Sequence, residues 1–427
     1  MTDRNHWIRG ARYFISAFIF YESYIKEAFG NYPLILYGTV ILATLCVAAD
    51  LVSNKGKLPF LGFPFMLIGY GIYSFLTGLF VSRDLTWFYS IMVTHFAFSI
   101  VCFDCCYVIK RNNSSEWLLN TFLITAAVCS IQTIFFGADY RTEVIVRTMS
   151  INNNPNILGL TMIIGIFSLI SRKKYVVKHF WVSMAIATVF LYVILLTASR
   201  KCLLSALALI CIWMYSVLKT DKGFNFRKIS MIFAILIAIG LGVYYYATKY
   251  ATSSVYARML LLSGGLSTRT TMVSDAIEYW KTSPIIGIGF CQYQIWSPYK
   301  AFSHNSYAEV LCCTGIIGFL LFFTPIVYYL VRITKTTIYK DAKDRYDYSM
   351  CLVMLIIELA LGAGQIFLYD VSHLLILTYL SVCIASITIE TERDQELQKV
   401  YGETIIQRRF FKPKLNNFEW ARKEIQQ

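Results

Sequence analysis

The stretch "SHNSYAEVLCCTGIIGF", from Ser303 to Phe319, changes character within a few residues and decides how the whole chain is interpreted. It opens with a hydroxyl, an imidazole and a carboxamide, and it continues as a mostly apolar run to about residue 330. A helix needs roughly 20 apolar residues to cross a bilayer core of about 30 Å. His304 and Asn305 therefore stand at the threshold of a predicted membrane span, where ionisable groups are costly.

The same apolar pattern recurs along most of the 427-residue chain. Apolar residues make up 57% of it and charged residues only 15%, against about 25% charged residues in a soluble domain. The sequence thus predicts an all-α polytopic membrane protein rather than several soluble domains. About twelve transmembrane helices are expected, at residues 12–29, 33–52, 60–82, 86–109, 117–137, 156–171, 180–199, 202–218, 229–247, 306–330, 349–368 and 371–389.

The net charge of +14 is explained by membrane topology. With a cytoplasmic N-terminus, 28 of the 39 lysine and arginine residues fall on the inner side of the predicted spans. The positive-inside rule then places both termini in the cytoplasm, and nucleic acid is not an expected partner. Residues 1–389 are expected to form a single transmembrane domain and residues 390–427 a cytoplasmic tail. Residues 1–10 lack an apolar core, so no cleavable signal peptide is expected.

The twelve cysteines do not form a recognisable metal or redox motif. A Cys-x-x-Cys pair, Cys102 and Cys105, lies inside an apolar span without a second pair to complete a ligand set. The adjacent cysteines Cys312 and Cys313 also lie inside a span. We expect these thiols to pack as small apolar side chains.

Two predicted outer loops are long, at residues 138–155 and 248–305. The second has about 58 residues, a length typical of functional loops. Within it, "STRTTMVSDAIEYWKTSP" (267–284) predicts a helix capped by Ser267 or Thr268, with an apolar stripe. The stripe consists of Met272, Ala276 and Trp280. Further rings are expected at the headgroup level of the outer leaflet, namely Tyr293, Trp296 and Tyr299.

Three predicted helices begin at the outer surface with polar residues. The span at 156–171 follows Asn154, a plausible cap, and Pro155 at its first helical position. Arg200 and Lys201 precede the span at 202–218, and Ser303 is expected to cap the span at 306–330. The positive ends of three helices, together with nearby cations, predict an anion site at one outer mouth. The cations on this side include Arg200, Lys201, Arg258 and Arg269.

Each of these features has a second interpretation. Arg200 and Lys201 suit an interfacial pair whose stems pack on apolar surface. Arg269 suits an ion pair with Asp275 or Glu278, and His304 suits a hydrogen-bonded interfacial residue. Ionisable residues within or near the spans are further functional candidates, and they are His95, Asp104, Glu309, Glu358 and His373. Glu358 is the deepest, and the sequence does not identify its partner.

Four stretches together resemble the signatures of O-antigen ligases and of the related O-antigen and capsule polymerases. They are "NNNPNILG" (152–159), "LLTASRKCLLSALALI" (195–210), "STRTTMVSDAIEYWKTSPIIGIGF" (267–290) and "HNSYAEVLCCTGIIGFLLFF" (304–323). The stretches occur in the order of that family, with its large outer loop between them. The resemblance covers residues 150–330 well and the rest of the chain only through the number of spans.

The resemblance implies a GT-C-like, inverting membrane glycosyltransferase in the bacterial cytoplasmic membrane, with its active site on the extracytoplasmic face. The donor would be a glycan on undecaprenyl diphosphate, and the acceptor a second lipid-linked glycan or a lipid A core sugar. The two arginines of the family match Arg200 and Arg269, which would bind the diphosphate, and its histidine matches His304, the catalytic base. The small residue that usually follows the first arginine is Lys201 here. Supporting roles are expected for Lys201, Arg258, Asn156 and Asn305.

The resemblance also implies catalysis without a metal or cofactor, and the outer loops contain no Asp-x-Asp pair. Other polysaccharide-assembly proteins are expected partners beside the bilayer. Two different functions remain open, a lipid-linked oligosaccharide flippase and a peptidoglycan-type polymerase with Asp275 as its carboxylate. Between the two activities of the family, the departure at Lys201 favours polymerase over ligase.

Overall fold

The computed structural model describes residues 6–26, 32–53, 62–112, 114–142, 145–149, 154–172, 175, 178–197, 199–220, 266–337 and 345–401. The first part consists of helices α1 (His6–Phe20), α3 (Pro33–Ser53), α4 (Phe63–Val81), α5 (Leu85–Asn112) and α6 (Glu116–Phe136), with a π-helical segment η2 (Tyr21–Ile25) after α1. A two-stranded antiparallel hairpin follows, β1 (Ala138–Thr142) and β2 (Ile145–Met149).

The second part begins with α7 (Pro155–Ile170), α9 (Phe180–Leu196) and α10 (Arg200–Thr220). After a gap in the described residues come α13 (Leu266–Thr282), the short α14 (Tyr293–Trp296), α15 (Ser306–Thr337), α16 (Arg345–Gly362), the 3-10 turn η3 (Phe367–Tyr369) and α17 (Val371–Tyr401). The prediction of a helical fold is confirmed, with the hairpin as an addition that the sequence analysis missed.

Within the described residues, helices occupy eleven of the twelve expected spans, and the expected span at 229–247 lies outside them. The first helix departs most from its expected bounds. It begins at His6 instead of residue 12 and turns into the π-helical segment where Glu22 and Lys26 interrupt the apolar run. Glu22 and Lys26 form an ion pair of 2.8 Å there.

Five helices in the described part of the chain are long and apolar enough to cross a membrane, by length and composition. They are α3, α4, α5, α6 and residues 306–335 of α15. Large apolar side chains on these helices point outward: Leu34 is 89% exposed and Phe80 is 86% exposed. Such exposure is unfavourable in water and favourable in lipid. The structure is therefore that of a helical membrane protein.

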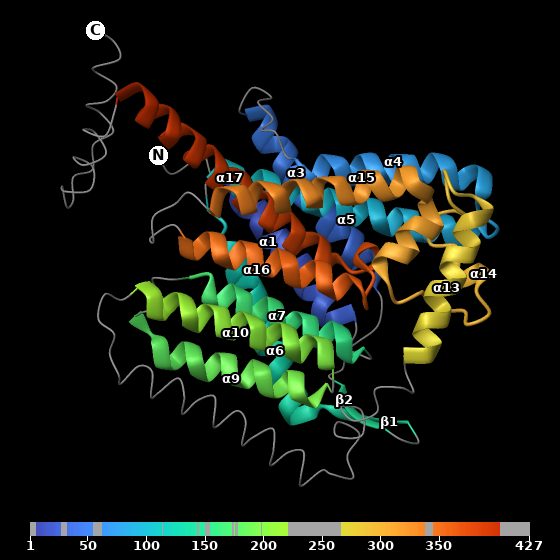
Figure 1. Cartoon of the computed structure of the whole chain (residues 1–427), viewed down its shortest axis with the longest axis horizontal. Coiled ribbons are helices and arrows are strands. Elements are labelled where there is room, and N and C mark those ends of the chain that lie inside the picture. The colour runs from blue at the N-terminus through green and yellow to red at the C-terminus, as the bar shows by residue number, and fades with distance from the viewer. Residues whose placement is uncertain are drawn as a thin grey trace.

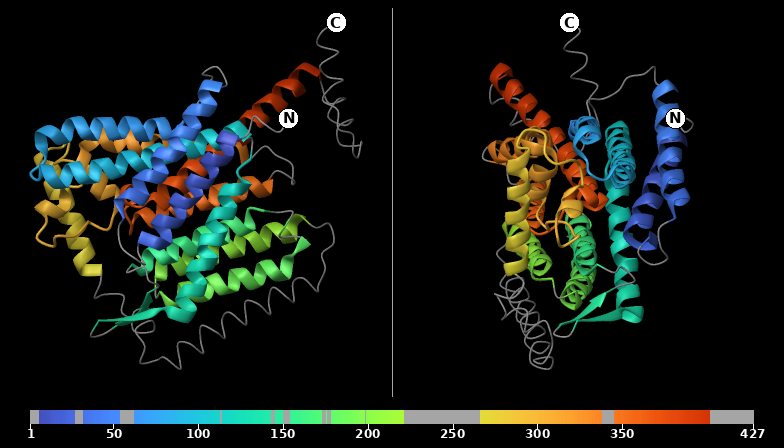
Figure 2. Two further views of the ribbon diagram at one scale, coloured as in Figure 1. Left: turned by 180° about the vertical axis from the view of Figure 1, so that it is seen from behind. Right: turned by 90° about the vertical axis from the view of Figure 1, so that its right-hand side faces the viewer.

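The helices form one bundle whose two ends differ (Figure 1). α7, α9 and α10 lie side by side in one part, and α4, α5 and α15 lie side by side in another. α16 contacts both α10 and α15 and so links the two parts. α13 and α14 lie at one end of the bundle, whereas α1 begins and α17 ends at the opposite end (Figures 1 and 2).

Several buried ionisable side chains inside the bundle are paired or hydrogen-bonded. Glu358 on α16 and His373 on α17 are both buried, and Glu358 Oε2 lies 2.5 Å from His373 Nδ1. This contact supplies the partner of Glu358 that the sequence did not reveal. Asp104 accepts a hydrogen bond of 2.8 Å from the Thr44 hydroxyl. The cysteines Cys102, Cys105, Cys312 and Cys313 are buried and free, as their expected packing role requires.

α15 is broken at Gly315, where φ is 64° and ψ is −171°. The segment 284–289, which follows α13, fills the break. Ile288 N and Gly289 N donate to the carbonyl oxygens of Cys312 and Cys313, both at 3.0 Å, and Ile316 N donates to Pro284 O at 3.0 Å. Non-helical backbone at membrane depth is tolerated where its polar groups are satisfied by protein. This pairing therefore joins α13 to α15 as one unit.

Candidate functional site

The starts of α7, α10 and α15 meet at the turn between α16 and α17, residues 362–367. Gln365 is the centre of the junction: its side-chain nitrogen donates to Asn156 O at 3.1 Å, and its carbonyl oxygen accepts from Ser306 Oγ at 2.6 Å. Lys201 Nζ donates to the carbonyl oxygen of Gly364 in the same turn. The expected convergence of three helix starts is thus present.

Asn156 connects the start of α7 to the start of α10. Asn154 caps α7 by accepting a hydrogen bond of 3.0 Å from Asn156 N, and Pro155 occupies the first helical position, both as expected. The Asn156 side-chain oxygen accepts from Ser199 Oγ at 3.1 Å. Because Ser199 directly precedes Arg200, this bond helps to place the arginine.

Asn305, and not Ser303, caps α15. Asn305 Oδ1 accepts from the backbone nitrogens of Tyr307 and Ala308, both at 3.0 Å. Ser303 lies two residues earlier, and its backbone nitrogen donates to Glu309 Oε2 at 2.8 Å. The expectation that Ser303 caps this span was wrong because Asn305 is the residue that directly precedes the first helical residue, Ser306.

His304 lies between these two anchored residues in a strained backbone conformation. Its φ is 57°, in the left-handed region that non-glycine residues rarely occupy. Such a conformation costs about 1–3 kcal/mol and persists only where the surroundings fix it. The side chain is half-buried, so part of it remains exposed.

Lys201 and Arg269 lie close enough to His304, and Arg200 lies close enough to Arg269, to act electrostatically. Partial burial and the positive charges of Arg269 and Lys201 lower the pKa of His304. Partial burial and the charge of Arg200 lower the pKa of Arg269, although part of the Arg269 side chain remains exposed. Gathered cations of this kind are stabilised by an anion. The neutral imidazole among them is suited to accept a proton.

α13 brings Arg269 to this cluster by packing on α15. Met272 and Ala276 are buried against Ala308 and Cys312, which confirms two members of the expected stripe. Trp280, the third member, is only half-buried, and its ring nitrogen donates to Pro284 O at 3.0 Å. α13 begins at Leu266, so neither Ser267 nor Thr268 precedes the helix as its cap.

The expected headgroup rings instead hold the outer segment together. Tyr293 is fully buried and its hydroxyl donates to Met272 O at 2.8 Å. The Arg83 guanidinium lies 3.2 Å from the centroid of the Trp296 ring, a cation–π contact. Gln292 accepts from the backbone nitrogens of Arg83 and Asp84 at 3.0 and 3.1 Å. These contacts dock the segment on the turn between α4 and α5, and only Tyr299 is exposed as expected.

Two predictions about the cations of the site, at Arg258 and at Glu278, have different outcomes. Arg258 lies outside the described residues. Glu278, an alternative partner for Arg269, instead pairs with Lys281 at 2.7 Å on the same helix.

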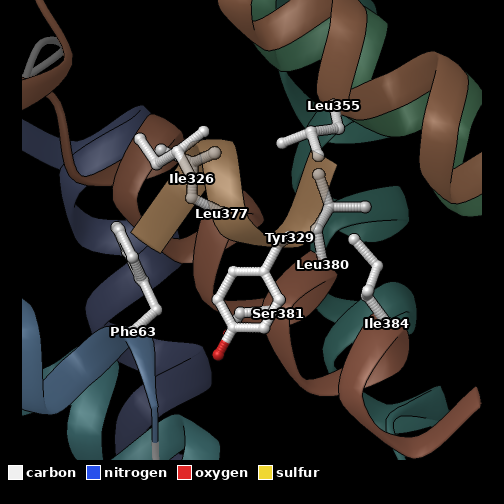
Figure 3. Close-up of a pocket in the computed structure, with 8 residues that line it drawn as sticks. All are labelled: Phe63, Ile326, Tyr329, Leu355, Leu377, Leu380, Ser381 and Ile384. Carbon is white, nitrogen blue, oxygen red and sulfur yellow. The ribbon is translucent and has the colours of Figure 1, made fainter. Parts of the chain in front are cut away.

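A small cavity lies among side chains of α4, α15, α16 and α17 (Figure 3). Its lining is apolar apart from Ser381 and the Tyr329 hydroxyl. Ile326 and Tyr329 belong to the part of α15 far from His304, and Leu355 and Leu380 come from α16 and α17. The lining of this cavity contains none of the cations of the cluster.

The turn at 362–367, which joins the helix starts, was not predicted from the sequence. Its signal was a Gly-Ala-Gly sequence, Gly362 to Gly364, inside the expected span at 349–368. Glycines at such a position indicate a turn. The sequence did not indicate that Gln365 would reach Asn156, more than two hundred positions earlier in the chain.

Comparison with known protein families gives one match. Residues 185–323 match the family model described as O-antigen ligase. The matched region contains Arg200, Lys201, Arg269 and His304, and Asn156 lies before it. A comparison with curated proteins finds no match. The family match supports a membrane glycosyltransferase of the O-antigen ligase or polymerase type.

Proposed function

The chain carries the O-antigen ligase domain in residues 185–323, and from that premise we propose that it is an inverting glycosyltransferase. It takes a glycan from undecaprenyl diphosphate and joins it to a sugar hydroxyl of a second lipid-linked glycan or of a lipid A core. The reaction takes place on the extracytoplasmic face of the bacterial cytoplasmic membrane, in the assembly of O-antigen or capsule.

One observation carries the proposal: a half-buried histidine shares a site with three cations at the junction of three helix starts. Arg269 and Lys201 act on His304, and Arg200 acts on Arg269. Backbone amides at helix starts and guanidinium groups both bind phosphate oxygens. A diphosphate is the anion whose size and charge suit two arginines, because each guanidinium can donate two parallel hydrogen bonds.

The chemistry follows from these groups. The oxygen of the acceptor hydroxyl attacks the anomeric carbon, and the bond from that carbon to the diphosphate oxygen breaks with inversion. The hydroxyl proton passes to His304, whose lowered pKa keeps the imidazole neutral at neutral pH. The electron pair of the broken bond stays on undecaprenyl diphosphate. Arg200 and Arg269 stabilise the charge that develops there, which is typically the largest catalytic contribution.

Polymerase activity is favoured over ligase activity. Lys201 stands where the family usually has a small residue, and it binds Gly364 O at the junction. The departure from the ligase pattern at this position is the feature that supports polymerase.

The test uses the purified full-length protein in lipid nanodiscs with a lipid-diphosphate-linked oligosaccharide. We expect glycosidic products without added metal or nucleotide. Longer lipid-linked chains indicate a polymerase, and transfer to an added lipid A core indicates a ligase. Product from a peptidoglycan precursor alone would indicate a peptidoglycan-type polymerase. Movement of the donor across a vesicle membrane without any new glycosidic bond would indicate a flippase and overturn the proposal.

A matched control separates enzyme from contaminant. His304→Gln should abolish most product, whereas Lys281→Met on the exposed surface of α13 should leave it unchanged, because Lys281 pairs with Glu278 on the same helix and lies outside the cationic cluster. Equal product from wild type and His304→Gln would show that the activity does not come from this site.

A further inference from the structure

Glu309 is a buried carboxylate in the first turn of α15, next to the proposed base. Its exposed fraction is 1%. Glu309 Oε2 accepts the backbone N–H of Ser303 at 2.8 Å, and Glu309 Oε1 lies 3.4 Å from the Tyr369 hydroxyl, which donates to it. Both carboxylate oxygens therefore face protein groups and not the outer mouth.

The bond from Ser303 to Glu309 closes a loop around His304. On the other side of His304, Asn305 is fixed by its cap bonds to Tyr307 N and Ala308 N, and its carbonyl oxygen accepts from Glu309 N at 2.9 Å. Ser303 Oγ also donates to Asn305 O at 3.1 Å. His304 is thus the one residue between two neighbours that are both tied to the first turn of α15.

This loop accounts for the left-handed backbone of His304. A residue with φ near 57° projects its side chain in a direction different from that of an extended residue. The conformation is unfavourable by itself, so it needs fixed neighbours. If Ser303 were released, His304 could relax to negative φ, and the imidazole would then leave its place beside Arg269 and Lys201.

We propose that Glu309 is a positioning residue that holds His304 in its left-handed conformation through the backbone of Ser303. This inference rests on the proposed function, because it assigns Glu309 a part in placing the base of that reaction. It also excludes Glu309 as the base, since its oxygens are occupied by Ser303 and Tyr369.

The test compares two substitutions at Glu309. Glu309→Gln keeps an amide oxygen that accepts from Ser303 N, so kcat should stay within about threefold of wild type. Glu309→Leu removes the acceptor at similar volume, so kcat should fall roughly 100-fold while KM for the donor is unchanged, as expected for a misplaced catalytic group. Tyr369→Phe is the matched control: it removes the second partner of Glu309, keeps the Ser303 bond, and should retain activity.

A double substitution separates positioning from general stability. If Glu309 acts through His304, Glu309→Leu should add almost no loss in a His304→Gln background. Additive losses would overturn the proposal, and so would a near-normal kcat of Glu309→Leu or an inactive Glu309→Gln. If Glu309→Leu does not accumulate in membranes, Glu309→Ala takes its place with the same expected loss of kcat. The kcat of Glu309→Gln tests the proposal independently of either variant. Failure of wild type to form any glycosidic product would instead refute the proposed function.

Discussion

Lys201 donates a hydrogen bond from its ammonium group to the carbonyl oxygen of Gly364, so the first turn of α10 is fastened to the turn between α16 and α17. The same turn binds Ser306 at the start of α15. Lys201 therefore sits where the two helices that carry the first arginine and the histidine are joined. Its charge also acts on His304, which gives this residue a measurable electrostatic role.

Replacing Lys201 with methionine should raise the pKa of His304, because the positive charge of Lys201 lowers it. Burial and the charge of Arg269 would still hold the pKa of His304 below its ordinary value in this variant. The base must be neutral to act, so the acid limb of the profile of kcat/KM against pH should move to higher pH. The variant should lose activity at about pH 6 and keep most of it at about pH 8, because the ordinary histidine pKa is near 6.5. The measurement is the pH profile of product formation, with Lys281→Met as the control. An unmoved acid limb would contradict this role.

Replacing either Arg200 or Arg269 with alanine should lower kcat/KM by roughly 10²–10³-fold, the usual loss on removing one donor to developing charge. Lysine at either position should restore little, because an ammonium group lacks the planar pair of donors. Initial rates with the lipid-diphosphate donor measure the loss, and protein yield in membranes serves as the control. Full activity of one alanine variant would remove that arginine from the donor site.

Replacing His304 with alanine should cut turnover by roughly 10²–10⁴-fold, as for the loss of a general base. Glutamine should do no better, since it keeps a hydrogen bond but does not take the proton at neutral pH. Donor binding should be retained in both variants, and binding of a labelled donor analogue measures this. A near-normal rate of His304→Gln would reassign His304 to acceptor positioning.

Replacing Gly315 with alanine should disrupt the pairing of the segment 284–289 with α15. A Cβ there would lie 2.2 Å from Ile285 O, and the φ of 64° disfavours any side chain. A loss of more than about 1 kcal/mol in stability is expected, together with lost activity. Gly69→Ala in α4 is the control, because a Cβ there meets nothing within 4 Å. Thermal unfolding of both variants in detergent provides the comparison, and equal midpoints would argue against the constraint at Gly315.

The proposed topology places α13 outside the cell membrane and the turn between α5 and α6 inside. Ser274 is exposed on α13, and Glu116 is exposed at the start of α6. In intact spheroplasts, a membrane-impermeant maleimide should therefore label Ser274→Cys, and should label Glu116→Cys only after permeabilisation. Labelling of wild type sets the background from its native cysteines. The reverse pattern would invert the orientation derived from the positive-inside rule.

Helix positions could be predicted from the sequence because long apolar runs respond to a single requirement, the thickness of the bilayer core. The cap of α7 at Asn154 could also be predicted, because it depends only on neighbouring residues: the following proline and the backbone amide of Asn156. The cap of α15 was misplaced by two residues, because Ser303 and Asn305 are both good caps. The structure decides between them, because Asn305 Oδ1 accepts from the backbone nitrogens of Tyr307 and Ala308.

Long-range contacts account for most of what the sequence did not reveal. Tyr293 was expected among headgroups, yet it is buried because its hydroxyl reaches Met272 on α13. The partner of Glu358 is His373, a pairing set by how α16 packs on α17. The order of residue types along the chain does not reveal which distant residues come into contact. The cluster around His304 could therefore be predicted only as a convergence of helix starts.

The break in α15 has a consequence for how the protein is made. The carbonyl oxygens of Cys312 and Cys313 accept hydrogen bonds from the amides of Ile288 and Gly289. Ile288 and Gly289 are synthesised before Cys312 and Cys313. The donors are therefore already synthesised when α15 emerges, and the helix can complete its main-chain bonding as it inserts. Under the proposed orientation, completion of this helix therefore depends on prior translocation of the segment 284–289, and a chain in which that segment does not cross would leave the carbonyl oxygens of Cys312 and Cys313 without these partners.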